Sequence, residues 1–556
     1  MSKFNKKKEP VIPTTVNDMG EKAFKLEAKE ALVATSLTTF LANGYYETET
    51  EITKRIKSDI KKVDPLFVAK LAVYLRQEAN MRSVSHLIAG ELSSVTAEWK
   101  TNFYKKVLVR PDDMAEILAN YIATNAAKNA KGKAKIPNAM KKAFKAKLES
   151  MDPYLIDKYK MKNRDFKLID LVNLFRPEPT SKNAEAYKRL MKGESLEGLY
   201  TSKIFEKEMS KAGQITPQST LTVDEAKVEA IEDVLGNVKG MPIFNLLRNL
   251  RNILEIAPHM VSEACSQLTN PMKVENSRLL PFRFATAYNE IVILTKDSGV
   301  AKTKGKSITF EKDTKTKLSE YTVVEFNAKK EEILNALETA LEYSVKNIPG
   351  LEGNVAILID HSGSVRGDGG GSSKLSAFGK TTHAMVGNLF GSMLAWRQDN
   401  VYIGNFGDNL ISVPVDRKQR MLDFNKKSFD EGSKCGGGTE NGLYIFLDNC
   451  IKEKTKVDYL CIFSDMVIGS GGIGGWDRSS NARLGTFQDL FKSFKALNPQ
   501  CKTICVDIKQ TKGTSVFDKS LQVLQVAGWS DKIFETIKAN CIGYKELIAQ
   551  IDAIVI

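Results

Sequence analysis

The sequence predicts an α + α/β protein, in which an array of α-helices is followed by a parallel β-sheet covered by helices. From Asn17 to about Asn347, apolar residues recur at three- and four-residue intervals, as in "DPLFVAKLAVYLRQEAN" from Asp64. Beyond Pro349 and Gly350, strand-like apolar runs alternate with helical ones. The 556 residues also exceed what a single hydrophobic core usually serves, so at least two domains are expected.

The helical part is predicted to span residues 17–348. Residues 1–16 are charged and contain proline, so we expect a flexible basic arm there. The stretch "EKAFKLEAKEALVATSLTTFLANG" from Glu21 has helical periodicity and a glycine stop, and we expect it to be helical throughout. Strand signals are sparse, and successive helix pairs of about 20 to 45 residues suggest an α-solenoid of the HEAT type, although no crisp repeat is present.

The α/β part is predicted to span residues 349–556. Its expected strands are Val355–Asp360, Val401–Phe406, Val457–Ser464 and Thr503–Ile508. Its expected helices are Ser376–Trp396, Asn441–Lys452, Leu484–Ala496 and Asp531–Ile551. Strict alternation of strand and helix favours a parallel sheet with helices on both faces.

The composition argues against a membrane or secreted protein. The longest apolar runs, such as "YLCIF" from Tyr459, are far shorter than the roughly 20 residues of a membrane span. The N-terminus, "MSKFNKKKEP", lacks the apolar segment of a signal peptide, so we expect a cytoplasmic protein. The seven cysteines are odd in number and lack paired spacings, which favours reduced thiols over disulfides or a zinc site.

The positive charge is concentrated in the helical part. Of the net +14, residues 352–556 carry only +2, since they hold 24 Lys and Arg against 22 Asp and Glu. Residues 128–167 alone hold 13 Lys and Arg against 4 acids. A local excess of this size attracts polyanions, nucleic acid first, through counterion release. The alternative for any charge run is a solvated helix face.

The stretch "MKKAFKAKLE" shows how such a face is built. Helical spacing puts Lys141, Lys142 and Lys145 on one flank, with Met140, Ala143 and Phe144 toward the core. Phe144 and the nearby Tyr159 are predicted to be core or half-buried residues, and base stacking is the alternative.

One stretch of the α/β part, "VAILIDHSGSV", predicts a metal site. It ends a strand with Asp360 and places Ser362 and Ser364 at alternate positions after it. Thr439 in "CGGGTEN" and Asp465 in "CIFSDM" follow later strands. Because ligands bind at the carboxyl ends of parallel strands, these five oxygen side chains are expected to converge. Hard oxygen ligands without histidine or thiolate favour magnesium or manganese.

The order Asp-x-Ser-x-Ser, then Thr, then Asp resembles the metal-ion-dependent adhesion site of von Willebrand factor A domains. The resemblance implies an open metal position that accepts a carboxylate from an acidic protein partner. No general base is evident, because the neighbouring His361 and His383 are expected to be solvated or packed side chains. The glycine runs "RGDGGGSS" and "GSGGIGGW" lack the Gly-Lys-Ser/Thr ending of a phosphate loop. A metal-dependent phosphotransfer enzyme is therefore disfavoured.

Four segments of the helical part resemble the TROVE module of the Ro autoantigen family, ring-shaped RNA-binding proteins. They are "DKYKMKN", "MPIFNLLRNLRNI", "RLLPFRFATAY" and "ILNALETALEYSVKNIPG". A fifth, "LQVLQVAGWSDKIFETI", resembles the end of that family's von Willebrand A domain. The resemblance implies helices closed into a ring, an outer face that holds structured Y RNAs, and a hole that admits single-stranded RNA ends.

The resemblance also implies particular RNA contacts. Lys158, Lys160 and Lys162 fall where the family has basic residues on its outer face. Arg176 falls where many members have a histidine that contacts RNA, and the arginine keeps phosphate binding while putting base reading in doubt. Arg248 and Arg251 have helical spacing and are either inner-cavity RNA contacts or structural arginines.

These expectations define a monomeric, non-enzymatic RNA-binding protein. It would bind Y RNA-like noncoding RNA outside and the 3′ ends of misfolded RNA inside, for RNA quality control, and DNA is not an expected partner. By resemblance it would pass RNA to an exoribonuclease such as polynucleotide phosphorylase. The rival hypothesis is a protein-interaction scaffold whose metal site binds an acidic protein.

Overall fold

The structure is a computed structural model, and it describes most of the chain. The described residues are 13–17, 20–39, 41, 48–125, 135–201, 204–214, 222–236, 240–294, 323–344, 348, 350–367, 373–374, 381–469, 475–477, 481–509, 514–518, 521, 523–528, 534 and 544–556. Positions 1–12 of the predicted arm lie outside them. Thr15–Val16 forms strand β1, so the arm is shorter than the predicted 1–16.

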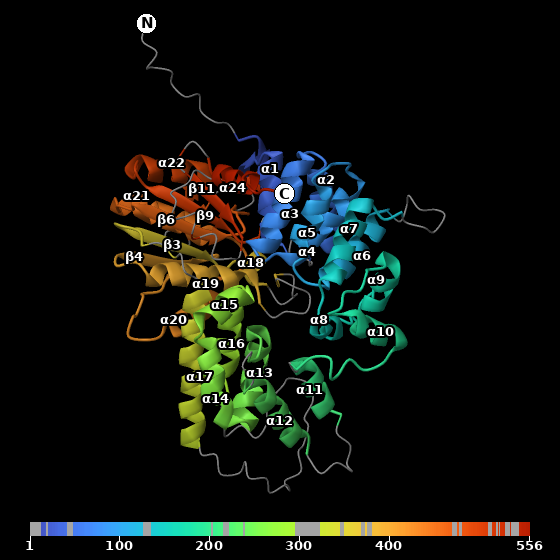
Figure 1. The fold of residues 1–556 in the computed structure, drawn as a ribbon. Coiled ribbons are helices and arrows are strands. Elements are labelled where there is room, and N and C mark those ends of the chain that lie inside the picture. Colours follow the sequence, from blue (N-terminus) through green and yellow to red (C-terminus); the bar gives the residue numbers. More distant parts are fainter. Residues whose placement is uncertain are drawn as a thin grey trace. The chain divides into compact units, whose positions relative to one another are not determined.

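The chain forms two compact units (Figure 1). One combines residues 1–195 with residues 347–556, and the other comprises residues 196–346. The helical region that the sequence suggests as a single domain is divided between them. The physical reason is packing of the first helices, because α1 (Ala28–Thr38) and α3 (Pro65–Gln77) contact the C-terminal helix α24 (Tyr544–Asp552).

Helices begin in the first unit where the sequence supplies caps. Asp64 accepts a hydrogen bond from the Phe67 amide at 3.0 Å, with Pro65 at the first helical position of α3. The other helices before residue 195 are α2 (Glu49–Ile60), α4 (Arg82–Glu91), α5 (Lys100–Val107), α6 (Asp113–Asn125), α7 (Asn138–Glu149), α8 (Pro153–Lys158), α9 (Leu168–Phe175) and α10 (Ala184–Lys192).

The helix predicted from Glu21 is wrong at its start. Strand β2 (Lys22–Lys25) occupies this segment and pairs antiparallel with β1 and with β10 (Thr514–Ser515). Ala23 and Phe24 are buried between exposed lysines. Pairing with β10, a strand distant in the sequence, overrides the local helical pattern. Such long-range pairing cannot be predicted from the residues of β2 alone.

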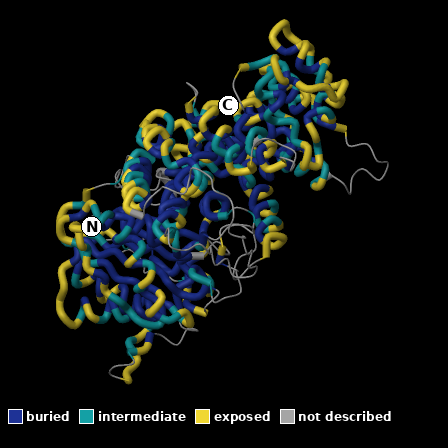
Figure 2. The backbone as a smooth tube through the Cα atoms, turned by 90° about the horizontal axis from the view of Figure 1, so that it is seen from below, coloured by how far each residue is buried: buried dark blue, intermediate teal, exposed yellow. Residues whose placement is uncertain are grey.

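The C-terminal part of this unit contains the predicted parallel sheet. Its strand order is β11-β9-β6-β3-β4-β5, and all pairs are parallel except β4 with β5. The strands are β3 (Val355–Asp360), β4 (Val401–Phe406), β5 (Leu410–Ser412), β6 (Tyr459–Ser464), β9 (Lys502–Asp507) and β11 (Val523–Ala527). The predicted strands are confirmed to within two residues. Every residue of β3 is buried, and Figure 2 shows the strands as a dark interior.

Helices cover both faces of the sheet, as predicted. They are α18 (Gly363–Arg366), α19 (His383–Trp396), α20 (Met421–Gly432), α21 (Asn441–Glu453) and α22 (Phe487–Leu497), and a hairpin of β7 (Gly475–Asp477) and β8 (Ala482–Gly485) adjoins α21. Ala356 and Leu358 share a core with aromatic residues of α21 and α22. Ile357 and Ile359 instead lie against Gly391 of α19, whose missing side chain permits the close approach.

The second unit is helical in its described part. Its helices are α11 (Phe205–Ala212), α12 (Val223–Leu235), α13 (Ile243–Ile256), α14 (Val261–Leu268), α15 (Pro271–Ser277), α16 (Phe282–Val292) and α17 (Val323–Ser344). Across the described residues, no helix combines the length and apolar character that a bilayer span requires. The six cysteines among them are free and buried.

Candidate functional site

The predicted metal ligands gather where parallel strands end. Asp360 is the last residue of β3, and Asp465 directly follows the neighbouring strand β6. With Ser362 and Ser364 after β3, these four side chains are at most 3% exposed. Together with Thr439 they are called the strand-end site below. The sequence located its chain positions, and the sheet brings Asp360 and Asp465 to one edge.

Hydrogen bonds orient the Asp360 carboxylate. Oδ1 accepts from the backbone amide of Ser362 at 2.8 Å, and the hydroxyls of Ser362 and Ser364 lie 3.1 Å apart. Oδ2 accepts from the hydroxyl of Ser464 at 2.5 Å. The sequence reading missed Ser464, although its place directly before Asp465 on a buried strand was a usable signal.

Thr439 is held close to the same loop by backbone and side-chain contacts. The Gly363 amide donates to the Gly437 carbonyl at 2.9 Å, so the glycine loop lies against the start of α18. The Thr439 hydroxyl donates to Oδ1 of Asp408 at 2.8 Å and accepts from the Asn441 amide at 3.3 Å, which leaves one oxygen lone pair for another partner. Asp408 is a second residue that the sequence reading missed, because it lies in a short polar loop after β4.

The strand-end site concentrates buried negative charge. Burial, and then the charge of Asp465, raise the pKa of Asp360 to about 7, against the hydrogen bonds from Ser464 and Ser362. Burial also raises the pKa of Glu440, followed by the charges of Asp360 and Asp465. Asp507, at the end of β9, has its pKa raised by burial and by Asp465. Carboxylates that raise one another's pKa in this way are stabilised by a bound cation.

The donor chemistry fits a hard divalent cation. Oε2 of Glu440 is buried and has no hydrogen-bond partner among the described residues. Within the same described part of the chain, no three His, Cys, Asp or Glu side chains are arranged as a metal site. A cation at the strand-end site would therefore use serine and threonine hydroxyls together with Asp360 and Asp465, a set typical of magnesium or manganese.

The two nearby histidines are packed side chains. His361 accepts a hydrogen bond at Nδ1 from Arg366 at 2.7 Å, and burial lowers its pKa to about 3. His383 is also buried, and its pKa falls to about 3 for the same first reason. Neither imidazole is available as a general base. The central glycines of the two predicted glycine runs lie outside the described residues.

The lysine side of α7 has the predicted geometry. Met140, Ala143 and Phe144 are buried in the core, while Lys141 and Lys142 are exposed. Phe144 is therefore a core residue. Lys145 is engaged, since its ammonium lies 2.5 Å from Glu178 and 3.7 Å from Glu149. Positions 128–134 of the basic stretch lie outside the described residues.

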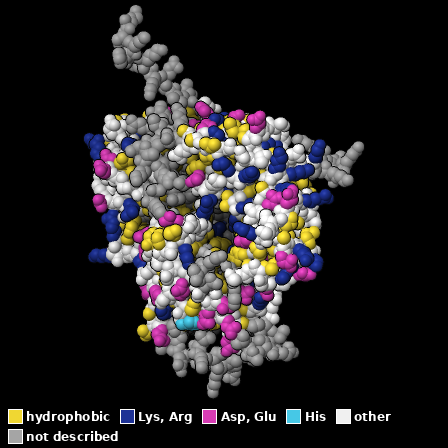
Figure 3. Space-filling view, viewed as in Figure 1, with side chains coloured by type: hydrophobic (Ala, Val, Ile, Leu, Met, Phe, Trp, Pro, Cys, Tyr) yellow, Lys and Arg dark blue, Asp and Glu magenta, His cyan; other side chains and the backbone are white. Residues whose placement is uncertain are grey.

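The segment after α8 contains lysines in different situations. Lys160 pairs at 2.8 Å with Asp157, whose side chain is fully buried, so its ammonium is engaged by an acid. The ammonium of Lys158 lies 5.6 Å from the ring centroid of Tyr154. Lys162 is exposed and has no ion pair with any described residue. Tyr159 is half-buried under the guanidinium of Arg110, at 5.6 Å. Figure 3 shows Lys and Arg side chains over the α7 to α10 side of this unit, interspersed with acids.

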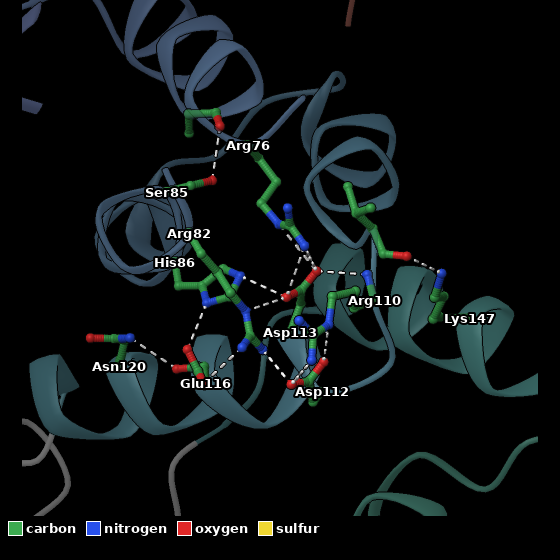
Figure 4. Close-up of polar contacts among 12 residues, drawn as sticks. Arg76, Arg82, Ser85, His86, Arg110, Asp112, Asp113, Glu116, Asn120 and Lys147 are labelled. Carbon is green, nitrogen blue, oxygen red and sulfur yellow. Dashed lines mark hydrogen bonds and ion pairs between the residues drawn. The ribbon is translucent and has the colours of Figure 1, made fainter. Parts of the chain in front are cut away.

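A buried ion network lies beside this segment (Figure 4). Its members, called the Asp113 network, are Arg76, Arg82, His86, Asp112, Asp113 and Glu116. Arg76 and Arg82 lie 3.0 and 2.8 Å from the Asp113 carboxylate. The surface residue Arg164 pairs with Glu116 at 2.8 Å, so the network anchors the basic segment. The charge-dense stretch "RPDDMAE" was its only signal in the sequence.

The network keeps Asp113 ionised. Burial alone would raise the pKa of Asp113, but the hydrogen bond and charge of His86 and the charges of Arg76 and Arg82 outweigh it. The pKa is consequently held well below its usual range. The His86 ring lies between two acceptors, with Nε2 3.2 Å from Asp113 and Nδ1 3.0 Å from Glu116.

The predicted RNA-contacting arginines are exposed. Arg176 ends α9 in a left-handed conformation with φ of 46°. On α13, Arg251 pairs with Glu255 at 3.0 Å, and the guanidinium of Arg248 lies 5.8 Å from the ring of Phe244. Phe244 itself is 42% exposed. Their exposure excludes a buried structural role and leaves both arginines accessible to a ligand.

Comparisons with known proteins agree with the family resemblance. A family profile described as the TROVE domain matches residues 5–212 and 216–353. Among solved structures, the chain is similar to the Ro (RSR) protein of Deinococcus radiodurans, with a TM-score of 0.53 and 12% identity over 93% of this chain and 100% of that one. No curated protein sequence matches the chain. The mostly parallel sheet is consistent with a von Willebrand A domain.

Replacing Asp113 by Asn should lower the free energy of unfolding by about 3 to 5 kcal/mol, because Arg76 and Arg82 lose a buried counter-charge. A depressed carboxyl pKa contributes stability above the unfolded-state value. The loss in free energy of unfolding, relative to the parent, should therefore be largest above about pH 5. It should shrink as the pH falls toward 3. Urea denaturation at several pH values measures it. The exposed Asp165→Asn is the matched control, and an equal loss in both variants would contradict the structural role of the network.

Proposed function

Because this chain belongs to the TROVE domain family, whose members are RNA-binding ribonucleoprotein components, we propose that it binds small structured noncoding RNA of the Y RNA type on an outer basic face. The same protein takes the single-stranded 3′ ends of misfolded RNA into a ring cavity, as a step of RNA quality control. It acts as a cytoplasmic monomer without catalysis of its own and passes RNA to an exoribonuclease.

The observation that carries this proposal is the exposed lysine side of α7. Lys141 and Lys142 project from a helix whose other side is fully buried, and neither pairs with an acid among the described residues. Lys162 has the same availability in the neighbouring segment. Free ammonium groups on a fixed scaffold bind phosphates and release counterions, whereas lysines engaged by carboxylates contribute little.

The strand-end site supports a second function beside RNA binding. We propose that Asp360, Ser362, Ser364, Thr439 and Asp465 hold magnesium or manganese there. The bound ion would neutralise the buried carboxylates and fix the loops at the edge of the sheet. The rival scaffold function, in which the ion also binds an acidic protein, draws on the same residues.

Replacing Lys141, Lys142 and Lys162 by Ala should flatten the slope of log affinity against log salt by about two units, since each phosphate contact adds about 0.7 to 0.9. Filter binding with a structured small RNA over a salt series measures this. The control replaces three exposed lysines of the α/β part, Lys418, Lys427 and Lys492. If both triple variants show the same slope of log affinity against log salt, RNA does not bind at α7.

An RNA hairpin with an unpaired 3′ tail of about ten nucleotides should bind more tightly than the same hairpin with a blunt end. A single-strand cavity excludes duplex by sterics, and arginines attract phosphates without reading bases. The preference should fall in the double variant Arg248→Ala, Arg251→Ala and change little with tail sequence. Competition binding decides it, and equal affinity for both RNAs would refute entry of RNA ends into a cavity.

Asp360→Ala should abolish binding of magnesium and manganese while RNA affinity stays within a factor of about two, because the metal ligands and the lysines lie on separate elements. Titration calorimetry measures the affinity for the metal, and a filter-binding assay measures the affinity for RNA. The exposed Asp399→Ala serves as the control for loss of one acid. Unchanged metal binding by Asp360→Ala would show that the ion, if any, binds elsewhere.

A further inference from the structure

A cavity of about 380 Å³ opens at the edge of the parallel sheet that is opposite the strand-end site. It lies where β3, β4 and β6 begin, next to the last turns of α21, which packs against β4 and β5 (Figure 1). Its volume is within the range of about 300 to 1,000 Å³ that small-molecule sites occupy. No function proposed above uses this cavity, which is called the strand-start pocket below.

The strand-start pocket has an apolar and aromatic wall. Phe446 and Val457 are buried lining residues, and the rings of Tyr402 and Phe446 lie with their centroids 5.5 Å apart, inclined by 32°. Gly404 leaves room for this wall, because an added Cβ would lie only 2.9 Å from the side chains of both Leu410 and Tyr402. A wall of this kind favours a flat aromatic ring, which stacks on other rings as it leaves water.

Two asparagines at the rim of the pocket present a hydrogen-bond donor next to an acceptor. The side-chain amide of Asn400 donates to Oδ1 of Asn354. Neither side chain makes another hydrogen bond with a described residue, so Nδ2 of Asn354 and Oδ1 of Asn400 are available to a ligand. Asn449, exposed on α21, adds a third amide whose side chain has no partner in the described part of the chain.

The charges around the pocket disfavour a phosphate inside it. Glu453 is exposed at the rim and has no ion pair with any described residue. The one cation among the described lining residues, Lys456, donates to the Leu497 carbonyl at 3.0 Å. Helix α21 also ends at Glu453, and the C-terminal carbonyls of a helix disfavour anions. The pocket therefore favours a neutral ring that carries hydrogen-bond donors.

We propose that the strand-start pocket binds an adenine base, with its ring against Tyr402 and Phe446 and its hydrogen-bonding edge on Asn354 and Asn400. Adenine combines a flat fused ring with an amino group beside a ring nitrogen, and asparagine amides recognise this donor and acceptor as a pair. The amino group donates to Oδ1 of Asn400, and the ring nitrogen accepts from Nδ2 of Asn354. Sugar and phosphate stay outside the pocket. The inference does not depend on RNA binding by the lysines of α7.

Titration calorimetry of the full chain with adenosine and with purine riboside tests the proposal, because purine riboside has the same ring and sugar but lacks the amino group. Adenosine should bind about 3- to 10-fold more tightly than purine riboside, the difference expected for one hydrogen bond. Asn400→Ala should remove this preference, whereas Asp399→Ala, an exposed neighbour that does not line the pocket, should keep it. No adenosine binding, or an unchanged preference in Asn400→Ala, would overturn the proposal.

Photocrosslinking locates the base and distinguishes its two sources. The probes are 8-azidoadenosine monophosphate and a single-stranded RNA that contains one 8-azidoadenosine. Labelling of residues 400–402 or 446–457 by the mononucleotide indicates a free nucleotide, and labelling by the RNA alone indicates a base of a bound strand. Asn449→Trp, which places a large side chain at the rim, should abolish the labelling, whereas Lys452→Trp, exposed on the same helix but not lining the pocket, should not. Labelling of neither segment by either probe would overturn the pocket, and the RNA face on α7 would be unaffected by that result.

Discussion

Parallel pairing of β3 with β6 is the constraint on which the rest of the strand-end site depends. The register that matches Val355 with Tyr459 brings the carboxyl ends of both strands to one edge, and Asp360 and Asp465 follow from it. Two acids in a buried place repel each other, so the surrounding loops must fix their orientation. The Ser464 hydroxyl, at the end of β6, orients the Asp360 carboxylate. The hydrogen bond between Gly363 and Gly437 holds the loop that contains Thr439 close to the residues after β3.

Hydrogen bonds from the first residues of the chain support the sheet edge that contains the strand-end site. The Asn17 side-chain amide donates to the Ile468 carbonyl at 2.6 Å, three residues after Asp465. The Tyr444 hydroxyl, on the helix that follows Thr439, donates to Glu21 at 3.2 Å. Because β2 also pairs with β10, the first residues are built into the α/β part. The sheet edge with the strand-end site and the first helices therefore belong to one structural unit.

Buried charge is used in two opposite ways in the first unit. The Asp113 network surrounds its carboxylates with Arg76, Arg82 and His86, so the native state favours their ionised form. At the strand-end site, acids lie against acids, and the native state favours protonation or a bound cation. The first arrangement is complete within the chain and supports the helices. The second arrangement raises the pKa of its buried acids, and such shifts are common at functional sites.

The sequence by itself determined the class of each part and the chain positions of the strand-end residues. Apolar runs and helical periodicity are local properties, so β3 and β4 were predicted with their observed bounds, and Asp360 and Asp465 were located from the ends of β3 and β6. It also located the family through short motifs.

What the sequence could not supply was any property that depends on residues distant in the chain. Strand β2 exists because β10 pairs with it. Lys160 is paired with the buried Asp157, whereas Lys162, two residues later, is exposed and has no ion pair among the described residues. Burial, followed by the charges of Asp360 and Asp465, raises the pKa of Glu440, and neither burial nor distance in space is written in a local pattern.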